Sequence, residues 1–152
     1  MRIYAIDPGP EKSAWVYIEQ EAGTEILAAF DYQANADINF GDFVPVAIEM
    51  IESYGMAVGA ETFQTCVAIG EFRERFGGPR YVTLIGRKAV KINLCGSARA
   101  KDANIRQAII DRYGGPAAIR KGGPLYKVSS HIWAALAVGL TYLDQQKVGG
   151  KL

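Results

Sequence analysis

The sequence predicts one α/β domain in which a five-stranded mixed sheet is flanked by helices. Three β-prone segments come first, at residues 2–6, 14–18 and 25–30, and turn residues separate them. Apolar residues at helical spacing follow at about 57–76, and further helical patterns lie late in the chain. Strands followed by helices, in a chain of 152 residues, are typical of a single domain with one sheet.

The first three strands are expected to form an antiparallel meander. The first ends at Asp7, and Pro8-Gly9-Pro10 follows as a turn. Ala22-Gly23-Thr24 separates the second strand from the third. A fourth, continuously apolar segment at 43–48 ends at Glu49 and suits a strand covered on both faces, although Pro45 disfavours a strand that begins before it. Residues 81–85 form the fifth strand.

The helical patterns have recognisable ends. The first stops at Gly77-Gly78, and a second, around residues 105–113, could be capped by Asp102 and closed by Gly114-Gly115. A final helix is expected from Ser129 or Ser130 to about residue 146. We therefore assign residues 1–146 to one domain and residues 147–152 to a flexible tail.

Composition excludes several classes of protein. No apolar run approaches the roughly 20 residues that span a bilayer, and Asp7 interrupts the place where a signal peptide would be apolar, so we expect a cytoplasmic protein with no membrane partner. Two distant cysteines and one histidine leave no disulfide framework or zinc finger. The chain also lacks the glycine-rich phosphate-binding motifs and the nucleophile elbow of serine hydrolases.

The charge is segregated along the chain although the net charge is only +1. Residues 1–72 hold two basic and twelve acidic residues, whereas residues 73–127 hold thirteen basic and three acidic residues. Such asymmetry favours either a polyanion such as DNA as a partner or a bipolar surface that serves solubility or self-association.

Two acids stand at strand ends, where α/β sheets usually bind ligands. Asp7 follows the first strand and Glu49 the fourth. Each alone would be explained by turn formation or capping. Together, two carboxylates at one edge would repel each other unless a cation lay between them, which predicts a site for Mg²⁺ or Mn²⁺.

These residues resemble the RuvC-type Holliday junction resolvases of the ribonuclease H-like superfamily. The resemblance rests on Asp7 in I-D-P-G, Glu49 in A-I-E, the run Val90-Lys91, Gly96-Ser97 and Lys101, and the last helix. It extends to about residue 142, and Ser53-Tyr54-Gly55-Met56 is similar to the phage-borne branch. It implies a ribonuclease H-like nuclease domain that cuts four-way or other branched DNA with Mg²⁺ or Mn²⁺, as two ions, and that works as a homodimer in a bacterial or phage-infected cell.

The resemblance also implies roles for individual residues. Asp7, Glu49 and His131 would hold metal, and His131 could instead accept a proton from the attacking water. Tyr54 and Met56 would wedge between or stack on exposed bases at a branch point. Packing within the loop or the core is the alternative for both and the simpler one for Met56. The DNA phosphates would be contacted by five basic residues: Lys88, Lys91, Arg99, Lys101 and Arg106.

One position departs from the family pattern. The family's last helix carries a second acid three residues after the first metal ligand, and here Ala134 stands in that place after His131. The chain is then an inactivated variant, a natural variant that manages with three ligands or recruits Glu52, or a junction-binding module that does not cut DNA. An Asp at position 134 would lie on the same helix face as His131 and would separate these alternatives.

Overall fold

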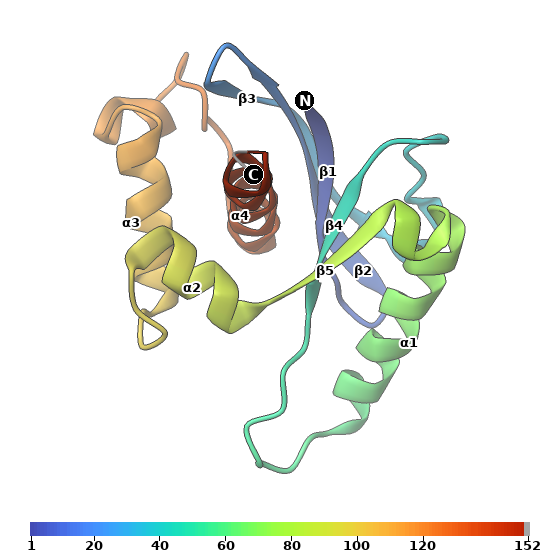
Figure 1. Cartoon of the computed structure of the whole chain (residues 1–152). Coiled ribbons are helices and arrows are strands. Elements are labelled where there is room, and N and C mark those ends of the chain that lie inside the picture. Colours follow the sequence, from blue (N-terminus) through green and yellow to red (C-terminus); the bar gives the residue numbers. More distant parts are fainter. Residues whose placement is uncertain (151–152) are drawn as a thin grey trace.

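The computed structural model describes residues 1–150 and contains one mixed sheet between helices (Figure 1). Its strand order is β3-β2-β1-β4-β5. β1, β2 and β3 pair antiparallel, whereas β4 is parallel to both β1 and β5. The predicted five-stranded mixed sheet with an initial meander is therefore confirmed. The strands are β1 (Arg2–Asp7), β2 (Lys12–Glu21), β3 (Thr24–Ala34), β4 (Val46–Met50) and β5 (Val82–Gly86).

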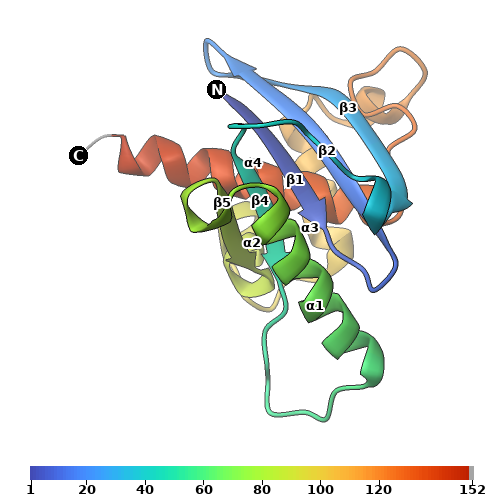
Figure 2. The same cartoon turned by 90° about the vertical axis from the view of Figure 1, so that its right-hand side faces the viewer.

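Helices cover both faces of the sheet. One helix, α1, lies on one face, and α4 lies on the other with α2 and α3 beside it (Figures 1 and 2). The four helices are α1 (Ala60–Arg75), α2 (Arg87–Cys95), α3 (Asp102–Arg112) and α4 (His131–Gly149), and three short 3₁₀ segments are Asn35–Asp37, Gly78–Arg80 and Pro116–Ile119.

The alternation of side chains along the strands creates two cores. Ile3 and Ala5 of β1 face α4, whereas Ile6 faces the α1 side with Ile48 of β4. Most of α4 is buried, and a Cβ atom at its Gly139 would lie 2.6 Å from Ile18 Cδ1. The helix therefore lies close against the sheet, which fixes where its N-terminus meets the strand ends.

Three sequence-based expectations about elements were wrong. β4 begins at Val46, immediately after Pro45, because Phe43 adopts a φ of +64° and its side chain is exposed. Helix α2 was missed because it has only nine residues, of which only Val90 is buried, too short a pattern to show helical periodicity. Asp102 does not cap α3: Lys101 holds the N-cap position, and its backbone N–H donates to Asn104 Oδ1 at 2.9 Å.

Helix α4 continues to Gly149 and so includes residues 147–149, which the sequence analysis assigned to a tail. Lys147 Nζ lies 3.1 Å from Glu25 Oε1 of β3, which holds this end of the helix against the sheet. Residues 151 and 152 of the expected tail lie outside the described residues. Within residues 1–150, no helix has the length and apolar character needed to cross a membrane.

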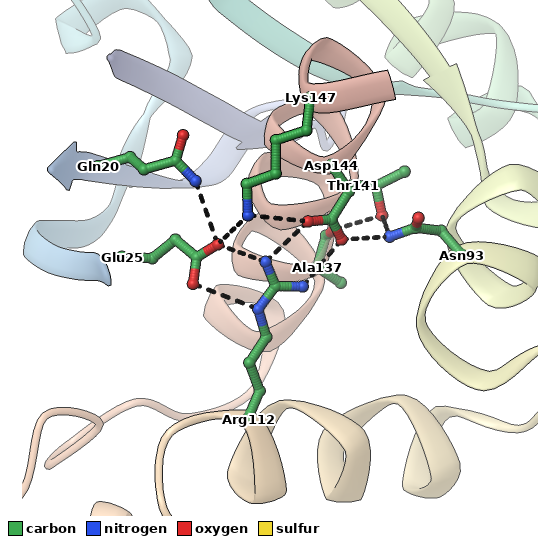
Figure 3. Close-up of polar contacts among 8 residues, drawn as sticks. All are labelled: Gln20, Glu25, Asn93, Arg112, Ala137, Thr141, Asp144 and Lys147. Atoms are coloured by element: carbon green, nitrogen blue, oxygen red, sulfur yellow. Dashed lines mark hydrogen bonds and ion pairs between the residues drawn. The ribbon is translucent and has the colours of Figure 1, made fainter. Parts of the chain in front are cut away.

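Arg112, the last residue of α3, ties the helical layer to the sheet (Figure 3). Its guanidinium donates to both carboxylate oxygens of Asp144 at 2.8 Å and also to Glu25. Asn93 of α2 donates to the same Asp144 carboxylate at 2.9 Å. Burial by itself would raise the pKa of Glu25 and of Asp144. The hydrogen bonds and charge of Arg112, together with the contacts from Lys147 and Asn93, outweigh burial and lower both pKa values.

We expect Arg112→Ala to lower the free energy of unfolding by about 2–3 kcal/mol, because it leaves two half-buried carboxylates without their charged donor. Arg112→Lys should not restore the loss, since an ammonium cannot make the bidentate contact with Asp144. Lys147→Ala, a more exposed member of the same network, should cost less than about 1 kcal/mol. Urea denaturation at pH 7 measures all three, and equal losses for Arg112→Ala and Lys147→Ala would contradict the assignment.

Candidate functional site

The sheet register places Asp7 and Glu49 side by side. In the parallel β1–β4 pair Ile6 lies opposite Ile48, so the next residue on each strand is an acid at the carboxyl end. Ile6 and Ile48 face the α1 side, and alternation therefore turns Asp7 and Glu49 toward α4. The two acids that the sequence analysis selected thus meet at one edge of the sheet.

The turn after Asp7 is fixed by close contacts that require glycine. A Cβ atom at Gly9 would lie 2.3 Å from the Lys12 carbonyl oxygen. The Gly9 N–H donates to Ser13 Oγ at 3.0 Å, and the Asn35 side chain donates to the Gly9 carbonyl at 2.9 Å. These contacts hold the end of β1, and with it Asp7, in one conformation.

His131, the first residue of α4, reaches this edge of the sheet and contacts Asp7. Its Nδ1 lies 3.0 Å from Asp7 Oδ2, and its ring stacks on Tyr32 at 5.6 Å between centroids. Ser130 precedes it with a φ of +49° and makes no side-chain capping bond, so the chain enters the helix through a strained residue. The positive end of the α4 dipole consequently points toward the carboxylates.

Burial and mutual repulsion disfavour the ionised forms of Asp7 and Glu49. Burial, and then the neighbouring charge of Asp7, raise the pKa of Glu49 to about 7, and the Arg87 guanidinium only partly opposes this. Burial also raises the pKa of Asp7 above its usual value, and the contact with His131 opposes this rise only in part. A cation bound between the carboxylates would relieve this repulsion, so the donor set suits a hard divalent ion.

The site has room for further ligands. Among residues 1–150, no cluster of three His, Cys, Asp or Glu side chains is arranged to hold an ion. Mg²⁺ commonly binds through one or two carboxylates and completes its coordination with water and substrate phosphate. Two recesses meet at His131: one of about 410 Å³ is lined by Asp7, Lys12 and Tyr32 among others, and one of about 230 Å³ is lined by Arg87, Asp102, Arg106 and Ala134 among others.

Arg87 is a site residue that the sequence analysis missed. It is the first residue of α2, and its Nη1 lies 3.7 Å from Glu49 Oε1 while Nη2 contacts Asp102. Its signal in the sequence was its place just after the strand at 81–85. Because β5 pairs parallel with β4, that strand ends beside Glu49.

The predicted DNA-contacting residues lie on the same side of the sheet as α4. Lys88 and Lys91 belong to α2, Lys101 is the N-cap residue of α3, and Arg106 follows on that helix. Arg99 lies in the turn between the two helices. All are exposed except Lys91, which is half-buried, and Arg106 also lies over the Trp133 ring at 5.1 Å. The basic residues are therefore concentrated on α2, α3 and the turn between them.

The loop between β4 and α1 projects from the body of the molecule (Figure 2). It exposes Tyr54 and Met56, so Met56 is not the core residue that was the simpler alternative. Glu52, which was considered as a replacement metal ligand, instead accepts a hydrogen bond from the Lys88 backbone N–H at 2.8 Å. It thereby caps α2, and the Tyr54 hydroxyl lies 3.5 Å from its carboxylate.

Solved structures with a similar architecture include Holliday junction resolvases. Thermus thermophilus RuvC superposes with a TM-score of 0.66 at 18% identity over 98% of this chain and 97% of that one. The same enzyme in complex with a Holliday junction substrate gives 0.67 at 19% identity, covering 98% and 96%. The chain has the RuvC fold. The fowlpox virus Holliday junction resolvase shares this fold with a TM-score of 0.53 and 15% identity over 95% of this chain and 99% of that one. No protein-family model and no curated protein matches the sequence.

In the metal-free protein we expect the Glu49 carboxyl to titrate near pH 7. Asp7→Asn should lower the midpoint by removing a neighbouring negative charge, and Arg87→Gln should raise it by removing a positive one. The ¹³C chemical shift of the Glu49 carboxyl carbon measures the titration. A wild-type midpoint near 4.5, or shifts of the same sign in the two variants, would contradict this electrostatic description.

Proposed function

We propose that this chain is a divalent-metal-dependent endonuclease that cuts four-way DNA junctions by phosphodiester hydrolysis in a bacterial or phage-infected cell. The pairing of Asp7 with Glu49 at the carboxyl ends of two parallel strands carries the proposal. Support comes from the RuvC fold over nearly the whole of both chains, and from the Thermus and fowlpox enzymes, whose structures hold junction DNA.

The residues of the site would have different roles in this reaction. Asp7 and Glu49 would hold Mg²⁺ or Mn²⁺, which when bound supplies positive charge to the phosphate and acidifies a bound water. His131 is engaged with Asp7 through Nδ1, which leaves Nε2 to bind the ion or to accept a proton from the attacking water.

The proposed reaction is hydrolysis of the bond between phosphorus and the 3′-oxygen. The oxygen of a water molecule bonds to phosphorus as the bond from phosphorus to the 3′-oxygen breaks. The water loses one proton, and the 3′-oxygen takes one up, so a 3′-hydroxyl and a 5′-phosphate remain. Because the phosphate carries its charge throughout, positive charge near it is the main requirement on the protein.

Branched DNA would lie across the face formed by α2, α3 and the projecting loop. Lys88, Lys101 and Arg106 would position the DNA backbone from α2 and α3, and Arg106 lines the same recess as His131. Exposed Tyr54 would stack on a base that has lost its partner at the branch point. These roles explain why a chain of net charge +1 concentrates its basic residues between 73 and 127.

A second candidate is a junction-binding module that does not cut. Ala134 favours it, because the family position for another carboxylate holds a methyl group beside the smaller recess. Both candidates bind the same DNA and differ only in hydrolysis.

A homodimer suits a substrate with two equivalent strands, and we propose that α1 forms its interface. Phe63 and Val67 lie one helical turn apart on α1 with 63% and 61% of their surface exposed. Gly70 continues the same stripe and allows close approach of a second helix. A second copy of this chain would bury these apolar side chains.

Asp7→Asn and Glu49→Gln should each lower cleavage of a labelled four-way junction in Mg²⁺ or Mn²⁺ by at least about a thousandfold, because a lost metal ligand removes several kcal/mol of charge stabilisation. The affinity for junction DNA without metal should stay the same or increase, because each substitution removes a negative charge that would repel the DNA phosphates. Gel-based cleavage and binding assays with matched duplex DNA measure both. A wild-type chain that binds junctions and never cuts them would establish the second candidate, and one that does neither would contradict both.

Lys91→Ala with Lys101→Ala should weaken junction binding and lower the slope of log affinity against log salt by about one unit per lost phosphate contact. Arg80→Ala is the matched control, because Arg80 is equally basic but precedes β5, whereas the site lies at the far end of that strand. An unchanged salt slope in the double variant would remove both lysines from the DNA surface.

Val67→Glu should convert a dimer into a monomer, because it places a charge in the centre of the apolar stripe. Analytical ultracentrifugation measures the change, and Glu74→Ala, on the last turn of the same helix, serves as the control. A wild-type chain that sediments as a monomer at tens of micromolar would contradict the interface.

A further inference from the structure

Arg87 occupies an unusual place for a positive charge in this site. Its side chain is 23% exposed, and its guanidinium lies between Glu49 at 3.7 Å and the carboxylate of Asp102. The backbone reaches this place because β5 ends beside Glu49 and α2 begins at once with Arg87. The contact is therefore built by the sheet and not by a mobile loop.

The space next to Arg87 is the space that a further acid on α4 would face. Ala134 lies one helical turn after His131, and both border the recess of about 230 Å³ that Arg87 also lines. Arg106 borders it too, held over the Trp133 ring. Two guanidinium groups, the Ala134 methyl group and the carboxylate of Asp102, which is paired with Arg87, thus line this recess.

Such a recess is unsuited to a second divalent ion. A metal ion there would meet the positive charges of Arg87 and Arg106, and the one carboxylate in the lining, that of Asp102, is already paired with Arg87. No three-ligand cluster exists among residues 1–150. A guanidinium, by contrast, matches the geometry of a phosphate and can donate two parallel hydrogen bonds to it. The charge that a second ion would bring to the phosphate is then already present in the protein.

We propose that Arg87 is a built-in substitute for one metal ion, so that the site binds a single Mg²⁺ or Mn²⁺ at Asp7 and Glu49 and contacts the cut phosphate directly through the Arg87 guanidinium. This proposal rests on the nuclease function proposed above. Arg87 is then a catalytic residue, because its guanidinium contacts the phosphate that is cut, and the bonds made and broken are those of the hydrolysis described above. The missing acid at Ala134 and the arginine at Arg87 are two parts of one arrangement.

The proposal makes metal affinity and catalysis change in opposite directions. Arg87→Gln removes a positive charge next to Glu49, so Mn²⁺ should bind about tenfold more tightly. The same change should lower junction cleavage about a hundredfold or more, because a group that stabilises the transition state is lost. Arg87→Lys keeps the charge and should retain the metal affinity of the wild type with an intermediate rate. Arg106→Gln is the matched control and should leave Mn²⁺ affinity within about twofold, since no contact joins Arg106 to Glu49.

The experiment titrates the full chain with Mn²⁺ at pH 8, where Glu49 is ionised, and follows free Mn²⁺ by electron paramagnetic resonance. We expect one ion per chain in the wild type and in Ala134→Asp, because the new carboxylate meets Arg87, and two ions in Ala134→Asp combined with Arg87→Gln. Two ions per wild-type chain, no ion at all, or an unchanged or weaker Mn²⁺ affinity in Arg87→Gln would overturn the proposal. Unfolding midpoints in urea confirm that each variant is folded.

The metal titration separates this proposal from the proposed function. If the wild type binds one ion and Arg87→Gln tightens it, but no variant cuts DNA, the arrangement of charges stands while the nuclease activity and the catalytic role of Arg87 fail. If the wild type cuts junctions and Arg87→Gln cuts equally well, the nuclease function stands and Arg87 is not a substitute for an ion.

Discussion

The parallel register of β1 against β4 is the constraint on which the rest of the site depends. It brings Asp7 beside Glu49, and alternation turns both acids to the face that α4 covers. Because α4 lies close to the sheet at Gly139, its first residue, His131, reaches the same edge. A shift of one residue in this register would turn one acid to the opposite face and separate the pair.

Holding two buried carboxylates together is unfavourable, and the surrounding structure offsets part of the cost. The start of α4 and the contact from His131 favour the charge on Asp7, and Arg87 favours the charge on Glu49. The Arg112 network lies at the other end of α4 and links three helices to β3 without contacting the acids. The Arg112 network and the pair of Asp7 and Glu49 are thus spatially separate.

Much of the fold was predictable because its signals are local. The strand runs, the turn at Pro8-Gly9 and the pattern of α1 all appeared in the sequence at about their observed positions. Helix α2 and the capping of α3 were not predicted, because α2 buries only Val90 and because Asp102 is drawn to Arg87, an ion pair that only the folded chain creates. Met56 is exposed although its residue type favours a core.

The sequence by itself determined that Asp7 and Glu49 end apolar strands and that His131 and Ala134 share one face of the last helix. It also determined that thirteen of the seventeen Lys and Arg residues fall between 73 and 127. Only the tertiary structure decided that Arg87 contacts Glu49, that Glu52 caps α2, and that Phe63 and Val67 face outward from α1. The physical reason is that periodicity and turn chemistry act between near neighbours in the chain. The charge that a carboxylate meets across a sheet, by contrast, is set by strand order and register, which local sequence does not specify.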